Sequence, residues 1–173
     1  VLQHQQAFSS YRSDYVYIPK LSNHDEDRSA SKLGKSVAKE KLAAAILLTT
    51  AGHPYIYYGE ELGIYGTKNN GDEYVRGPML WGDNTVTSYT SKIDKGVASS
   101  IKSATDQAAD ESSLLSNYRT YAQLRNTYPA LATGTMTRHE TYNESNTSLT
   151  SLAAWYMTEG SQKLLVLHNM SNT

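Results

Sequence analysis

One short stretch holds most of the side chains that could do chemistry. "KLSNHDEDRS", residues 20–29, places a histidine, three acids and an arginine within five positions. A carboxylate beside an imidazole can bind a polar ligand or take part in proton transfer. The preceding run "DYVYI" is rich in β-branched and aromatic residues, and Pro19 suits the last residues of a strand. We therefore expect a strand to deliver this charged loop.

Two interpretations of the loop are open. In the first, residues 25–28 form a water-facing first turn, where the dipole of the following helix favours acids. In the second, His24 and Asp25 lie at the carboxyl end of a parallel strand, where (β/α)₈ barrels keep their catalytic groups. The position of the loop directly after a strand favours the second interpretation.

The elements around the loop predict a βαβ unit. Apolar residues recur at roughly helical spacing over residues 32–51, and Gly52 is placed to end that helix. The run "HPYIYYG" follows without polar alternation, which is typical of a strand covered on both faces of a parallel sheet. Gly59 is expected where the backbone turns tightly after this strand.

The second half of the chain changes character twice. Residues 65–110 are dominated by turn formers and predict a long irregular segment. "ESSLLSNYRTYAQLRNTYPAL" predicts a helix that Ser112 or Ser113 caps and that stops before Pro129. After Leu131, β-rich runs separated by "NESNTS" and "EGSQ" predict antiparallel hairpins, so we place a domain boundary near residue 132.

Composition excludes several classes of protein. The 173 residues carry 16 basic and 17 acidic side chains without a basic stripe, so neither nucleic acid nor a membrane surface is an expected partner. "LAAAILLTTAG" is too short to span a bilayer, and "VLQHQQAFSS" lacks the regions of a signal peptide. The absence of cysteine suits a secreted or a cytoplasmic bacterial protein, so the localisation stays unknown.

No metal site and no cofactor site is predicted in this chain. The five histidines include no pair at ligand spacing, and Gly59, Gly63 and Gly66 fit no phosphate-binding pattern. Asp25 with Asp27, or the loop at Asp72, could hold a hard cation through oxygen, but acidic turns are usually just solvated.

Four stretches, in order, carry a resemblance to a known family. "LSNHDEDR" resembles the fourth conserved region of the α-amylase family of glycoside hydrolases, and "GHPYIYYGEELG" resembles its eighth barrel strand and the turn after it. "VRGPMLW" is similar to the Arg-x-Pro-Met-x-Trp segment of α-glucosidases, and "LLSNYRTYAQLRNTYPAL" to the eighth helix. The resemblance implies an α/β fold: the last two β/α units of a (β/α)₈ TIM barrel over residues 1–131, then a truncated antiparallel β-sheet domain C over residues 132–173.

The resemblance also implies roles for five residues. Asp25 would be the third catalytic carboxylate, which binds ring hydroxyls of the distorted sugar, and His24 and Asn23 of the same motif would bind substrate. Arg76 matches an arginine that reaches the terminal glucose, and Arg28 would border the aglycone side.

Each arginine has a structural alternative. That alternative is a surface ion pair worth about 0 to 1 kcal/mol, formed by Arg28 with Asp27 or Glu26 and by Arg76 with Asp72 or Glu73.

The sequence departs from the family in one large respect. The nucleophile motif Gly-x-Arg-x-Asp and the motif of the general acid Glu are both absent from the 173 residues. We therefore expect a fragment of a retaining glycoside hydrolase acting on α-glucosidic bonds of starch-like glucans, inactive as an isolated chain. Its expected partners are an α-glucan or malto-oligosaccharide and the missing N-terminal barrel portion, and calcium is a candidate only for the full-length enzyme.

Two other outcomes stay open. One is a non-catalytic carbohydrate-binding or interaction protein on an amylase-like scaffold, since one fold hosts many functions. The other is a chain whose uncovered surfaces pair between copies.

Overall fold

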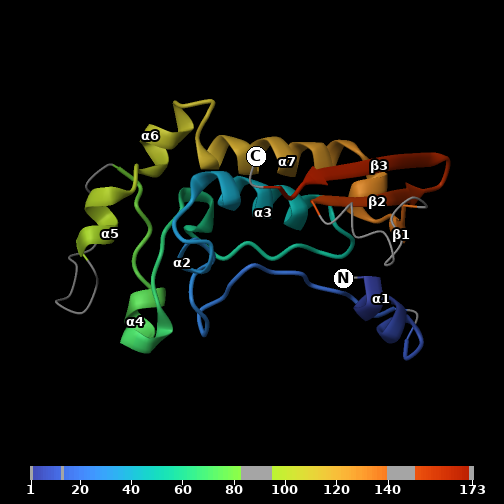
Figure 1. The fold of residues 1–173 in the computed structure, drawn as a ribbon, viewed down its shortest axis with the longest axis horizontal. Coiled ribbons are helices and arrows are strands. Elements are labelled where there is room, and N and C mark those ends of the chain that lie inside the picture. The colour runs from blue at the N-terminus through green and yellow to red at the C-terminus, as the bar shows by residue number, and fades with distance from the viewer. Residues whose placement is uncertain (1, 13, 83–94, 140–150, 172–173) are drawn as a thin grey trace. The chain divides into compact units, whose positions relative to one another are not determined.

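The computed structural model describes residues 2–12, 14–82, 95–139 and 151–171 (Figure 1). The chain divides into two compact units. The site unit takes in residues 20–45 and 55–121, and the sheet unit takes in residues 1–19, 46–54 and 122–173. The elements, in chain order, are α1 (Leu2–Ser9), α2 (Ser29–Lys32), α3 (Val37–Thr49), η1 (Glu60–Leu62), η2 (Lys68–Asn70), α4 (Asp72–Val75), α5 (Lys95–Ser100), α6 (Ala104–Ala108), α7 (Leu114–Thr127), α8 (Pro129–Ala132), β1 (Thr135–Arg138), β2 (Leu152–Glu159) and β3 (Gln162–Asn169).

The sheet unit is built on a three-stranded antiparallel sheet in the order β1-β2-β3 (Figure 1). Glu159 pairs with Gln162, so β2 and β3 are joined by a two-residue turn, and Gly160 takes a φ of 55° that glycine adopts freely. The predicted hairpin at "EGSQ" is confirmed. The predicted turn at "NESNTS" lies outside the described residues, and the boundary near residue 132 stays a prediction.

The core of the sheet unit lies on one face of β2. Side chains alternate along a strand, so Trp155 and Met157 point to the same side, where each is at most 5% exposed. Helix α8 packs on β2 and β3 and supplies Ala130 and Leu131 to the same cluster.

The helix predicted over residues 32–51 is present as α3, but it begins only at Val37, because the separate short helix α2 ends at Lys32. Gly34 and Lys35 both have positive φ angles, of 70° and 57°, so a right-handed helix cannot continue through them. Their N–H groups bond back to the carbonyls of Ser31 and Ala30, at 3.2 and 2.7 Å, in the pattern of a Schellman motif. Only the predicted start of the helix was wrong, because the apolar spacing was followed through a local stop signal at Gly34.

The predicted parallel direction of the two strands in the βαβ unit is confirmed, but the two strands themselves are not formed. Lys20 and Tyr55 form a parallel bridge, yet the residues around them are extended chain without a ladder. Tyr55, Ile56 and Tyr58 are each at least 39% exposed, so the expectation that this run is covered on both faces is wrong for this chain. A buried parallel strand needs neighbours on both edges and layers on both faces.

Helix α7 follows its sequence signals closely. The Ser113 hydroxyl accepts a hydrogen bond from the Ser116 N–H at 3.0 Å, which confirms Ser113 as the cap. The helix ends at Thr127, and Pro129 opens α8 in the position where its missing N–H costs nothing. The segment over residues 65–110 was expected to be irregular, but its described part contains short helices, of which α6 begins with a capping box at Ser103.

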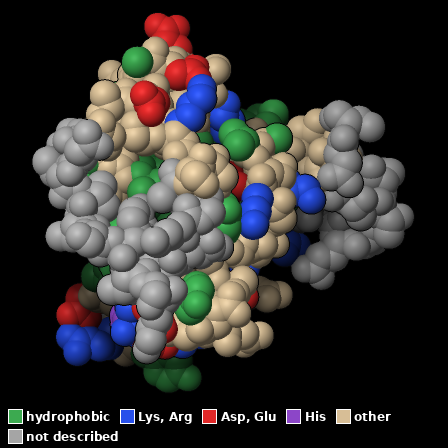
Figure 2. All heavy atoms as spheres, turned by 90° about the vertical axis from the view of Figure 1, so that its left-hand side faces the viewer, with side chains coloured by type: hydrophobic (Ala, Val, Ile, Leu, Met, Phe, Trp, Pro, Cys, Tyr) green, Lys and Arg blue, Asp and Glu red, His purple; other side chains and the backbone are tan. Residues whose placement is uncertain are grey.

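Figure 2 shows charged side chains of both signs on one face of the molecule. Among the helices that the structure describes, none has the length and apolarity to cross a membrane.

Candidate functional site

The loop after Lys20 is held in a turn by the side chain of Asn23. The Asp25 N–H donates to the Asn23 Oδ1 at 2.9 Å, a local bond that asparagine forms readily in turns. Asn23, predicted to bind substrate, is thus engaged with the backbone. The two side chains that follow, His24 and Asp25, are each 59% exposed.

Both oxygens of the Asp25 carboxylate have partners. Arg76 Nη2 lies 3.0 Å and Lys68 Nζ 3.5 Å from Oδ1, and His24 Nε2 lies 3.2 Å from Oδ2. A carboxylate offers about four acceptor positions, so Oδ2 keeps one for a further donor. Three of the predicted site residues, His24, Asp25 and Arg76, are therefore brought together by the structure.

Arg76 connects the loop to helix α4. Its Nε donates to the His24 carbonyl at 3.1 Å, and its Nη2 pairs with Asp72 Oδ2 at 2.7 Å as well as with Asp25. Lys68 also pairs with Asp72, and this hydrogen bond lowers the pKa of Asp72 and raises that of Lys68. Asp25, Lys68, Asp72 and Arg76 thus form a charge cluster in which each acid contacts both cations. The ion pair with Asp72 that was the alternative for Arg76 is present together with the contact to Asp25.

Arg28 lies elsewhere than expected. Its side chain has no exposed surface, and it donates from Nε to the Val75 carbonyl at 3.0 Å and from Nη1 to the Tyr58 carbonyl at 2.6 Å. The predicted place at the rim and the alternative of a surface ion pair both require exposure, so neither describes this arginine. Backbone carbonyls rather than acids satisfy the guanidinium, which the sequence could not show.

A buried acid lies in the same unit. Glu60 is 2% exposed and accepts hydrogen bonds from Ser22 Oγ at 3.3 Å and from the Tyr118 hydroxyl at 3.1 Å. Burial raises the pKa of Glu60 to about 7, although both hydrogen bonds act in the opposite direction. Ser22 lies two residues before His24, so the hydrogen bonds of Glu60 reach the start of the charged loop.

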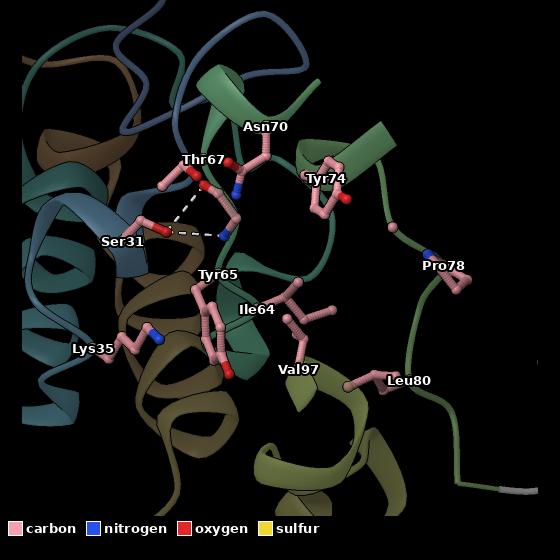
Figure 3. Close-up of a pocket in the computed structure, with 12 residues that line it drawn as sticks. Ser31, Lys35, Ile64, Tyr65, Thr67, Asn70, Tyr74, Pro78, Leu80 and Val97 are labelled. Carbon is pink, nitrogen blue, oxygen red and sulfur yellow. Dashed lines mark hydrogen bonds between the residues drawn. The ribbon is translucent and has the colours of Figure 1, made fainter. Parts of the chain in front are cut away.

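Two cavities of the site unit are distinct from the charge cluster. One, of about 180 Å³, is lined by residues that include Ser31, Tyr65, Asn70 and Tyr74 (Figure 3). In the same view, the Ser31 hydroxyl bonds to both backbone groups of Gly66. The other cavity, of about 480 Å³, borders Glu40 and Gln107. Asp25, His24 and Arg76 line neither cavity.

No cluster of three or more histidine, cysteine, aspartate or glutamate side chains that could hold a metal occurs in the part of the chain that the structure describes. Of the two acids considered for an oxygen site, Asp27 accepts the Lys68 N–H through Oδ1 at 2.6 Å, and Asp25 pairs with Arg76 and Lys68.

Two members of the site were not anticipated from the sequence. Lys68 lies in "GTKNNG", a turn-rich stretch where no periodicity marks a functional side chain. Glu60 was not anticipated because the two adjacent acids in "GEELG" give no sign of which one is buried. Only the tertiary contacts to Ser22 and Tyr118 distinguish Glu60.

Comparison with known proteins points in one direction. A family model described as the catalytic domain of α-amylase matches residues 2–134. The α-amylase SusG of Bacteroides thetaiotaomicron is 62% identical over 174 residues, which cover 100% of this chain and 25% of the relative. α-Amylase 3 of Dictyoglomus thermophilum is 31% identical over 170 residues, which cover 96% of this chain and 32% of the relative.

A solved structure shows the same fold. The crystal structure of α-amylase from H. orenii matches with a TM-score of 0.80 and 27% identity, covering 99% of this chain and 34% of that chain. The chain therefore spans a quarter to a third of the length of these relatives.

Proposed function

Because the chain belongs to the α-amylase family, with the TIM-barrel fold of that family and a small antiparallel sheet, we propose that it is part of a retaining glycoside hydrolase acting on α-glucosidic bonds of starch-like glucans. In this proposal residues 1–131 supply the last two β/α units of the barrel, and residues 132–173 begin domain C. The parallel bridge between Lys20 and Tyr55 and the antiparallel order of β1, β2 and β3 support that division.

The observation that carries the proposal is the environment of Asp25. Its carboxylate is fixed by Arg76 and Lys68 on Oδ1 and approached by His24 on Oδ2, while more than half of the side chain stays open to solution. A carboxylate that is oriented before substrate arrives can accept a sugar hydroxyl without paying to be ordered. In retaining glycosidases such bonds to the 2-OH strengthen as the ring becomes oxocarbenium-like.

The roles of the other site residues follow from their contacts. His24 borders Oδ2, so its ring can reach the hydroxyl that Asp25 accepts. Arg76 holds Asp25 and presents an exposed guanidinium to the same side, where it can donate to a glucose unit. Asn23 shapes the turn that presents both side chains. Asp25 supports the reaction, whereas the covalent step and the proton transfer require a nucleophile and an acid that the barrel's preceding strands would supply.

A graft tests this proposal directly. Residues 1–173 would replace the 174 aligned residues of the Bacteroides thetaiotaomicron α-amylase to give the grafted enzyme. We expect the grafted enzyme to hydrolyse starch with retention, and the chain of residues 1–173 alone to show no turnover because it lacks both reagents. Reducing-sugar release measures turnover, and NMR of the anomer formed first shows whether the configuration is retained.

The alternatives appear as distinct results of the same experiment. A folded graft that binds malto-oligosaccharide but does not hydrolyse starch would favour the non-catalytic scaffold. A chain that forms oligomers by size-exclusion mass measurement, together with an inactive graft, would favour pairing of uncovered surfaces.

A further inference from the structure

We propose that Arg28 is a positioning residue, which sets the place of Arg76 and through it the orientation of the Asp25 carboxylate. The inference rests on the proposed function, because it assigns Arg28 a part in the reaction that Asp25 supports. It replaces the expectation that Arg28 meets the substrate itself.

Arg28 joins three segments of the site unit. Its backbone N–H donates to the Gly66 carbonyl at 3.0 Å, and its side chain donates to the carbonyls of Val75 and Tyr58 at 3.0 and 2.6 Å. The planar guanidinium carries its donors in a fixed fork, so holding two carbonyls at once fixes their separation. Arg28 thereby ties the charged loop to the segments before η1 and at the end of α4.

The Val75 carbonyl is the link to the charge cluster. This carbonyl belongs to the peptide unit that leads into Arg76, and it accepts a second hydrogen bond from the Tyr57 hydroxyl at 3.1 Å. Two buried donors on one carbonyl fix the plane of that peptide. Arg76 leaves this fixed point to reach the His24 carbonyl and Asp25 Oδ1, at 3.1 and 3.0 Å.

The packing around Arg28 leaves the guanidinium little freedom. Its Cζ lies 4.5 and 4.8 Å from the ring centroids of Tyr57 and Tyr58. Gly59, with a φ of 81°, is required beside it, since a Cβ there would lie 2.5 Å from the Ile64 Cδ1 and 3.4 Å from the Arg28 Nη1. A rigid support of this kind fixes the position of Arg76, whose ion-pair partners Asp25 and Asp72 are both exposed.

Stability alone does not explain this arginine. The acceptors of its side-chain hydrogen bonds are backbone carbonyls rather than acids, and its Nη2 is buried without a hydrogen-bond partner. Burial lowers the pKa of Arg28, as expected for a charge taken out of water. An apolar side chain of similar volume often stabilises a protein as well as a buried charge does, so the charged fork points to a geometric requirement.

A double-mutant cycle in the grafted enzyme, which carries the full chain, tests the inference. We expect Arg28→Met to lower kcat by about 10- to 100-fold with little change in KM, the loss that a misplacement of about 1 Å produces. In an Arg76→Ala background the same substitution should lower kcat by less than about 3-fold, because the residue through which Arg28 acts is gone. Arg28→Lys should recover little of the loss, since an ammonium cannot hold both carbonyls.

Arg125→Met is the matched control. Arg125 is also a buried arginine that donates to backbone carbonyls, but those carbonyls belong to the sheet unit. A purely structural role for Arg28 predicts that both substitutions lower Tm and leave kcat unchanged. Equal loss of kcat for Arg28→Met with and without Arg76, or no loss of kcat, would overturn the inference.

A milder variant decides the question if Arg28→Met does not fold. Tyr57→Phe removes only the second donor to the Val75 carbonyl and keeps the ring under Arg28. We expect kcat to fall about 2- to 10-fold in the presence of Arg76, in line with one lost hydrogen bond of about 1 kcal/mol, and not in its absence. An unchanged kcat for folded Tyr57→Phe would refute the inference. An inactive but folded graft would instead refute the proposed function, so the two failures are distinguishable.

Discussion

The two buried arginines, Arg28 in the site unit and Arg125 in the sheet unit, use the same chemistry for different ends. Arg125 donates from Nη1 to the carbonyls of Leu48 and Thr50 at 3.2 and 3.0 Å, and from Nη2 to those of Gly52 and Ala132. It thereby satisfies carbonyls that the ends of α3 and α8 leave without partners. Arg28 instead holds a carbonyl that precedes a charged side chain of the candidate site.

Neither the burial of an arginine nor the type of its hydrogen-bond partners shows which function its charge serves. Both guanidiniums donate to backbone carbonyls, and burial lowers the pKa of both. The difference lies in what is attached to the carbonyls. The carbonyls that Arg125 binds lie at or just after the ends of α3 and α8. The Val75 carbonyl that Arg28 binds precedes Arg76, which contacts Asp25.

The largest expected effect on stability is in the sheet unit. Arg125→Met leaves several buried carbonyls without donors, which we expect to cost about 3 to 5 kcal/mol of unfolding free energy. Urea denaturation of the grafted enzyme measures the cost, and kcat measured on the folded fraction should match that of the unsubstituted graft. A large fall in kcat would remove the contrast between the two arginines.

Glu60 gives the site unit a pH dependence. Its pKa in the folded state, about 7, lies above its usual value of 4.5, so the folded state keeps a proton that the unfolded state releases. Stability should therefore fall as pH rises from 4.5 to 7, by about 3 kcal/mol at most. Glu60→Gln should flatten the curve of Tm against pH over this range. An identical slope in both proteins would show that Glu60 is not the group that titrates.

The sheet unit should respond to pH in the opposite sense. His168 is 6% exposed, its Nε2 lies 2.9 Å from the Thr49 hydroxyl, and its ring lies 5.1 Å from Trp155. Burial lowers the pKa of His168 below 6.5, so the unfolded state takes up a proton first and stability is lost as pH falls below 6.5. His168→Gln should reduce this loss, which hydrogen exchange of β3 amides between pH 5 and 7 can follow. Faster exchange at the higher pH, after correction for the intrinsic rate, would contradict the assignment.

The smallest effect is expected for Asp72. Its pairs with Lys68 and Arg76 are exposed to water, and exposed ion pairs contribute little. Asp72→Asn should leave Tm unchanged and lower kcat less than about 3-fold at low salt, a difference that disappears in about 1 M salt because the charges are screened. A loss as large as that of Arg28→Met would mean that Asp72, not Arg28, fixes Arg76.

Local signals were sufficient for helix α7 and for the turn between β2 and β3. Neighbouring residues determine the cap at Ser113, the helix stop before Pro129 and the turn at Gly160. The structure contains all three features. The Asn23 to Asp25 stretch was also recognisable, because its types and spacing form a motif.

Contacts across long separations were not predictable. Arg28 looked like a surface residue because it ends a charged run, yet its partners lie 30 and 47 positions away. Lys68 reaches Asp25 from a stretch without periodicity. A buried position for a charge becomes visible only when the distant carbonyls that satisfy it are known.

The central claim is that Asp25 is the carboxylate that meets the sugar, and the kcat of Asp25→Asn in the grafted enzyme tests it most directly. Asp27→Asn is the matched control, because Asp27 lies in the same loop and its Oδ1 accepts the backbone N–H of Lys68. We predict that Asp25→Asn lowers kcat by about 10³-fold with an unchanged Tm, and that Asp27→Asn lowers it less than about 10-fold. A near-normal kcat for folded Asp25→Asn would contradict the account.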